Sequence, residues 1–148
     1  MTVPPNIPRQ VYADVEDAIG SLRRSGLRLS TARRLVLEAL YAADGPVTAP
    51  HLAGVLSLEE SSVYRNLELL EGRGLVRHLH LGQSAGLYVL AGDDDLEYLY
   101  CERCDKLTAV TPQRLDAVRE QITHQFGYTP RFTHSAIIGI CRDCAGLV

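Results

Sequence analysis

No apolar stretch in this 148-residue sequence approaches the roughly 18 residues that a membrane-spanning helix requires. The first ten residues are polar and contain prolines, without the hydrophobic core of a signal peptide, so we expect a cytoplasmic protein. Catalytic patterns are missing as well. No glycine-rich phosphate-binding loop occurs, and Ser61 and Ser62 have no obvious base beside them. We therefore expect a protein that is not an enzyme.

Lysine is absent from residues 1–82, where nine arginines balance nine acidic residues. Residues 83–148 carry six basic and nine acidic residues, which accounts for the whole net charge of −3. A negative net charge does not exclude a DNA-binding protein, because binding to DNA requires only that basic residues cluster on one face. The sequence is 46% hydrophobic and 22% charged, which is typical of a folded globular protein.

The four cysteines form two C-x-x-C pairs, Cys101 with Cys104 and Cys141 with Cys144, separated by 36 residues. Such a spacing lets both thiolates of a tight turn reach one ion, and tetrahedral zinc is the usual ion of a four-cysteine site. In a reducing compartment zinc explains the two pairs better than disulfide bonds do. The alternatives are a disulfide framework or a thioredoxin-like redox pair, which would leave the second pair unexplained.

Apolar residues recur at helical spacing four times in the first half of the chain. The predicted helices span residues 12–25, 31–43, 49–56 and about 60–72, with Ser30 and Thr48 as capping residues. Residues 75–81 and 87–90 then alternate as strands around a turn at residues 82–84. Helices followed by a β-hairpin predict a winged helix-turn-helix, in which the helix at 60–72 would enter the major groove of DNA.

Three aspartates at 93–95 mark a predicted hinge to a second, smaller unit. We expect strands at 98–101, 107–110 and 131–140, with a helix at 112–126 that begins at a proline. The core of so small a unit is thin, so zinc would supply stability and an exposed sheet edge would suit dimerisation. The predicted architecture is α+β, with a winged-helix DNA-binding domain at 1–92 and a zinc-stapled dimerisation domain at 93–148.

Several motifs resemble the ferric uptake regulator family of metal-dependent repressors. The segment from Gly26 to Arg33 is similar to the entry of the family's second helix, and Ser62-Val-Tyr-Arg-Asn-Leu67 to its recognition helix. Both cysteine pairs, with Gly127-Tyr128 between them, match its dimerisation domain. The resemblance implies a homodimeric repressor with structural zinc on the four cysteines. It also implies DNA contacts from Arg33, Ser62, Tyr64 and Arg65, for which core packing and an ordinary solvated surface are the alternatives.

The family's regulatory metal site at the hinge is altered in this sequence. Its ligand positions fall on residues with poor or no ligand atoms, so we expect the usual sensor site to be absent. These residues are Pro46, Val89, Leu96 and Tyr98. A second family site would map onto Asp95, Glu97, Asp116 and Thr133, with His134 one position on. Three carboxylates and His134 would suit a second divalent metal, Zn, Mn or Fe(II), whereas the alternative is solvated surface.

His78 and His80 lie two residues apart on a predicted strand and could form a relocated metal site with Asp93 or Asp94. The alternative is that they simply lie on the surface of the wing.

The leading functional hypothesis is a DNA-binding transcriptional regulator whose partner is duplex DNA. We expect no membrane partner and no small-molecule substrate. A thiol-redox protein and a zinc-bound interaction module without DNA binding are the alternatives.

Overall fold

The computed structural model describes residues 7–92 and 96–146. The chain divides into two compact units. The first unit comprises residues 1–78 and 85–93, and the second comprises residues 79–84 and 94–148. Among the described residues, no helix is both long and apolar enough to cross a membrane.

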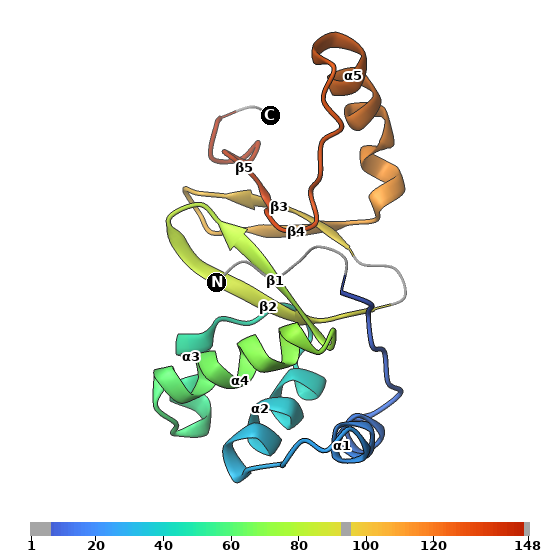
Figure 1. Cartoon of the computed structure of the whole chain (residues 1–148). Helices are drawn as coiled ribbons and strands as arrows, with labels where there is room; N and C mark the ends of the chain where they lie inside the picture. Colours follow the sequence, from blue (N-terminus) through green and yellow to red (C-terminus); the bar gives the residue numbers. More distant parts are fainter. Residues whose placement is uncertain (1–6, 93–95, 147–148) are drawn as a thin grey trace. The chain divides into compact units, whose positions relative to one another are not determined.

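The first unit contains four helices, drawn in blue to green in Figure 1. They are α1 (Val15–Arg24), α2 (Thr31–Ala42), α3 (Ala49–Leu56) and α4 (Glu60–Gly72). Each of the first three begins at a side chain that accepts a hydrogen bond from a backbone N–H of the first turn, which satisfies one of the free helical donors. The caps are Asp14, Ser30 and Thr48. The capping roles expected of Ser30 and Thr48 are therefore confirmed.

The core of the first unit lies between α4 and the neighbouring helices. Val63, Leu67 and Leu70 are fully buried on α4 and recur at positions i, i+4 and i+7, which places them on one face of the helix. They belong to the same hydrophobic cluster as the buried Val36 and Leu37 of α2. This packing fixes the orientation of α4, so that its opposite face is directed to solvent.

A two-stranded hairpin of β1 (Val76–Leu81) and β2 (Ser84–Leu90) follows α4. The backbone leaves α4 through Gly74, whose φ of +83° favours glycine. Val47, between α2 and α3, forms an isolated antiparallel bridge to Tyr88 of β2. The ring of Tyr88 stacks on His78 at a centroid distance of 4.6 Å. Helices followed by this hairpin constitute the predicted winged-helix arrangement.

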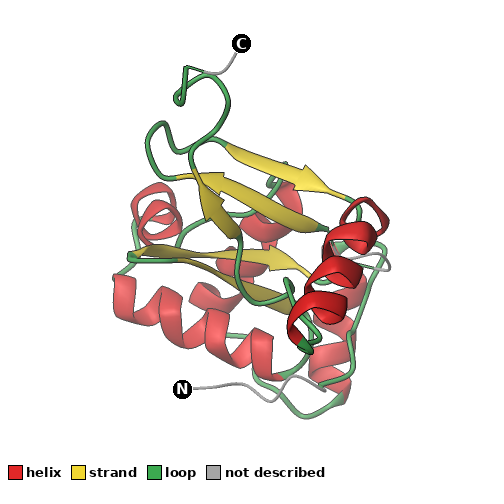
Figure 2. Ribbon diagram, turned by 90° about the horizontal axis from the view of Figure 1, so that it is seen from above, coloured by secondary structure: helices red, strands yellow, loops and turns green. Residues whose placement is uncertain are grey.

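The second unit contains a three-stranded sheet in the order β4–β3–β5, with strands yellow in Figure 2. Strand β3 (Glu97–Cys101) pairs antiparallel with β4 (Leu107–Val110) and parallel with β5 (Ile137–Gly139). The connection from β4 to β5 contains a short 3₁₀ helix η1 (Pro112–Leu115) and helix α5 (Asp116–Phe126). A parallel pair needs such a long connection, because the chain must return to the same end of the sheet.

The α+β architecture is confirmed, whereas the last strand is shorter than predicted. The sequence predicts a strand at 131–140, but β5 is only three residues long. The segment changes its hydrogen-bonding partner along its length. His80 donates from its N–H to the carbonyl of His134 and accepts from the N–H of Ala136, before β5 pairs with β3. The domain boundary after residue 92 stays a prediction.

Candidate zinc centre and DNA interface

Each cysteine pair lies in a tight turn at the end of a strand in the second unit. Cys101 is the last residue of β3, and Cys104 lies in the turn that leads to β4. The turn is closed by the Asp105 N–H, which donates to the Cys101 carbonyl at 2.9 Å. After β5, the Ala145 N–H closes the second turn on the Cys141 carbonyl at 2.9 Å. Because β3 and β5 are neighbours, the two turns meet at the same end of the sheet.

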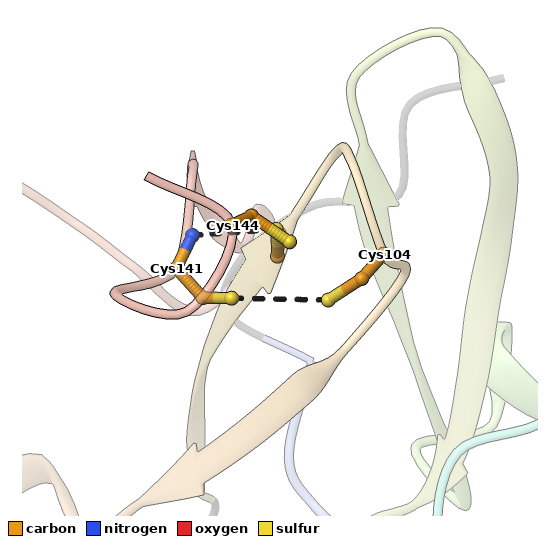
Figure 3. Close-up of side chains that lie close together, drawn as sticks. Cys104, Cys141 and Cys144 are labelled. Atoms are coloured by element: carbon orange, nitrogen blue, oxygen red, sulfur yellow. Dashed lines mark hydrogen bonds between the residues drawn. The ribbon is translucent and has the colours of Figure 1, made fainter. Parts of the chain in front are cut away.

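The four sulfur atoms converge on one point. All lie within 4.8 Å of one another, and the Sγ atoms of Cys104 and Cys141 are 3.8 Å apart. Figure 3 shows the side chains of Cys104, Cys141 and Cys144 directed toward each other. A tetrahedron with zinc–sulfur bonds of about 2.3 Å has sulfur–sulfur edges of about 3.8 Å, so the donor set fits a structural zinc ion.

The electrostatics of the cluster also favour a cation. Backbone N–H groups, first that of Cys141 and then that of Cys104, lower the pKa of the Cys101 thiol to about 6. Hydrogen bonding with Cys141, followed by desolvation, raises the pKa of Cys144 to about 12. The Cys101 thiolate thus forms readily, whereas the raised pKa values of Cys104 and Cys144 favour their protonated thiols. A zinc ion bound by all four sulfurs would stabilise every thiolate and tie the two turns together, with no coordination position left open.

Three of the predicted DNA-contacting residues lie in the first two turns of α4. Arg65 is exposed, whereas Ser62 and Tyr64 are half-buried. Tyr64 packs against the hydrophobic core, so its ring is partly committed to the fold. Of these three, Arg65 therefore presents the long charged donor that is most available to a DNA backbone or base edge.

Arg33, the fourth predicted contact, is bound to α4 through Asn66. The Nε of Arg33 donates to the Asn66 Oδ1 at 3.0 Å, and its guanidinium also donates to the carbonyl of Arg28. Asn66 is only 6% exposed, and its Nδ2 donates to the Ser62 carbonyl at 2.9 Å. Arg33 thus joins the start of α2 to α4, a role that neither the predicted DNA contact nor the solvated-surface alternative anticipated.

The members of the predicted second metal site have a different partner. Asp95 lies outside the described residues, as do Asp93 and Asp94. Glu97 and Asp116 both accept hydrogen bonds from the guanidinium of Arg119. Among the described residues, only the four cysteines form a cluster of three or more potential metal ligands. Within the described residues, Glu97 and Asp116 thus bind a guanidinium, and the second metal site, of which Asp95 lies outside these residues, stays a prediction.

Asn66 and Arg119 are the residues of these two regions that the sequence analysis did not single out. Asn66 occupies a helical position between the buried Val63, Leu67 and Leu70, where a polar side chain needs a hydrogen-bonding partner. A polar residue at such a position could therefore have indicated a buried hydrogen bond to another element. Arg119 lies three residues after Asp116, a spacing at which helical side chains meet, but its partner Glu97 lies 22 residues away on another element.

The sequence and the structure of this chain are both similar to those of the same family of proteins. The family model described as "Ferric uptake regulator family" matches residues 24–136. The peroxide-responsive repressor PerR of Staphylococcus saprophyticus is 27% identical over 135 residues, covering 88% of this chain and 90% of that protein.

Two solved structures show the same fold. The ferric uptake regulator Fur of Helicobacter pylori matches with a TM-score of 0.68 and 19% identity, over 88% of this chain and 91% of that one. A zinc uptake regulator complexed with zinc and DNA matches with a TM-score of 0.52 and 22% identity, over 90% and 93% of the two chains. Since the family model covers well over half of the sequence and the cysteine centre and winged helix lie where the resemblance implied, the chain belongs to the ferric uptake regulator family.

Proposed function

We propose that the chain is a sequence-specific DNA-binding transcriptional repressor that acts as a homodimer and carries one structural zinc per chain. The observation that carries this proposal is helix α4, held by its buried face in a winged-helix unit while Arg65 is exposed near its N-terminus. The recognition helix of this motif contacts base edges through N-terminal residues of that kind. Its relatives include a repressor, PerR, and a zinc uptake regulator in complex with DNA.

The test is a comparison of Arg65→Ala with the wild-type protein on a duplex selected from a random pool by the wild-type protein. We expect a loss of binding free energy of about 1–3 kcal/mol, with fold and oligomeric state unchanged. Arg131→Ala is the matched control, because it removes an exposed arginine from the second unit. Wild-type affinity in the Arg65 variant would contradict the assignment of α4, and failure to enrich any duplex would contradict DNA binding itself.

Dimerisation is supported by apolar side chains that are exposed on the second unit of the single chain. Exposed apolar side chains of this kind favour association with a partner surface that would cover them. They are Leu96, Val118, Phe126, Tyr128, Ile138 and Ile140. Sedimentation equilibrium of the zinc-loaded protein should give the mass of two chains, and a monomer at micromolar concentration would refute the homodimer.

The repressor is proposed to lack the usual metal sensor of its family. Pro46, Val89 and Leu96 have no side-chain ligand atom, and the Tyr98 phenol is a poor one. A ligand can shift a conformational equilibrium only through its differential affinity for the two states, so without ligands there is little to sense. Excess Zn, Mn or Fe(II) should therefore change the DNA affinity of zinc-loaded protein by less than about tenfold, or roughly 1.4 kcal/mol. A larger gain would reveal a surviving sensor site.

A further inference from the structure

One arginine joins two carboxylates and a backbone carbonyl in the second unit. The Arg119 Nη1 donates to both carboxylate oxygens of Glu97, at 2.7 and 2.9 Å. Its Nη2 donates to the Asp116 Oδ1 at 2.7 Å and also to the carbonyl of Pro112. The planar guanidinium thus bridges strand β3, helix η1 and the first turn of α5. A single surface ion pair would not involve three elements in this way.

Burial makes this cation obligatory for Glu97. The glutamate is only 3% exposed, and a carboxylate removed from water is costly unless a charge or several donors satisfy it. Arg119 is itself largely covered, with its side chain 22% exposed and its Cζ 5.8 Å from the centre of the Phe132 ring. Hydrogen bonds to Asp116 and then to Glu97 raise the pKa of Arg119, so it remains charged.

The same oxygen atoms cannot serve the guanidinium and a metal at once. A divalent cation such as Zn²⁺ needs carboxylate oxygens at about 2.0–2.2 Å, directed to a common centre. The oxygens of Glu97 and Asp116 are instead held at 2.7–2.9 Å from the nitrogens of Arg119, which lies between them. Metal binding at this position would therefore require the displacement of Arg119 from both acids.

We propose that the guanidinium of Arg119 is the resident cation of Glu97 and Asp116, and that it keeps divalent metals out of this site. The arginine supplies the positive charge that a metal would otherwise bring to β3 and α5. The second unit is consequently held together at this point without responding to metal supply. This inference deepens the proposed function, on which its regulatory meaning rests, by stating why the acids of this unit do not sense metal.

The experiment measures binding of Mn²⁺ to zinc-loaded protein, from the EPR signal of the free ion, in the absence of DNA. The wild-type chain should bind no stoichiometric Mn²⁺ that depends on Glu97. Arg119→Ala and Arg119→His should each gain one site, with affinity at least about tenfold above the wild type. Arg114→Ala is the matched control, because Arg114 is exposed in the same segment and should leave Mn²⁺ binding unchanged. Thermal melting with and without Mn²⁺ is the second readout.

The two variants also cover the case in which the buried Glu97 prevents folding. If they fold only when Mn²⁺ is present, the metal has replaced the charge of Arg119, which supports the proposal. If they fold without gaining a site, or fail to fold with Mn²⁺ present, the proposal is overturned. Stoichiometric Mn²⁺ on the wild-type chain that is lost in Glu97→Gln would overturn it as well. None of these readouts involves DNA, so their failure is distinguishable from a failure of the proposed repressor function.

Discussion

Replacement of Asn66 by alanine should lower the free energy of unfolding of the first unit by about 2–4 kcal/mol, since two hydrogen bonds are lost from a buried position. A hydrogen bond to a charged group contributes about 1.5–3 kcal/mol net, and a neutral one about 0.5–1.5 kcal/mol. The 3.0 Å bond from Arg33 to Asn66 involves a charged group, whereas the 2.9 Å bond from Asn66 to the Ser62 carbonyl is neutral. Alanine recovers less than about 0.7 kcal/mol through its helix propensity.

The assay is urea unfolding followed by circular dichroism, with the slope of the transition compared between variants. Glu68→Ala is the matched control, because Glu68 is exposed on the same helix and should change stability by no more than about 0.5 kcal/mol. A double-mutant cycle with Arg33→Ala should give a coupling of about 1–3 kcal/mol. If the effects of the two single substitutions simply add, the bond between Arg33 and Asn66 does not stabilise the packing of α4 and the reasoning fails.

Three further predictions concern the zinc centre, the hairpin and alkaline pH. Cys101→Ser should lose the zinc and melt the second unit at a lower temperature, because that unit depends on metal-binding free energy; unchanged metal content by elemental analysis would contradict this. Gly86→Ala should cost about 1–3 kcal/mol, since its Cβ would lie 2.2 Å from the His78 Nε2, whereas Gly45→Ala meets no atom within 4 Å and should be nearly neutral in the same melt. Burial, followed by the charges of Glu71 and Glu68, raises the pKa of Tyr88 from 10.0 to about 12. Because the phenol is protonated in the folded state, Tyr88 contributes to stability fully below about pH 10, and this contribution should be lost between about pH 10 and 12. Urea midpoints of the wild type should therefore fall over this range by more than those of Tyr88→Phe.

The parts of the fold that the sequence predicts correctly are mostly those that depend on residues close together in the chain. Capping residues and 3.6-residue periodicity depend on neighbours within one or two turns, so Ser30, Thr48 and the buried face of α4 were visible without a structure. The length of β5 was not visible. The residues from 131 to 140 include Phe132, Thr133 and three isoleucines, which favour strands, but their pairing partners, His80 and β3, are distant in sequence. Strand ends are set by the partner, and the segment's own pattern carries no information about it.

The same distinction explains which parts of the site could be predicted. Two C-x-x-C pairs have few chemical uses, so convergence of the four sulfurs followed from residue type and spacing alone. Acidic residues have many uses, and the sequence offered no means to choose a counter-ion for Glu97 and Asp116. That choice depends on whether α5 brings a side chain across to β3. Arg119 does so from the second turn of α5: its Nη1 contacts both oxygens of the buried Glu97 carboxylate, while its Nη2 reaches Asp116. The burial of the Glu97 carboxylate therefore creates the need for a positive charge or several donors, and the packing of α5 against β3 supplies an arginine to meet it.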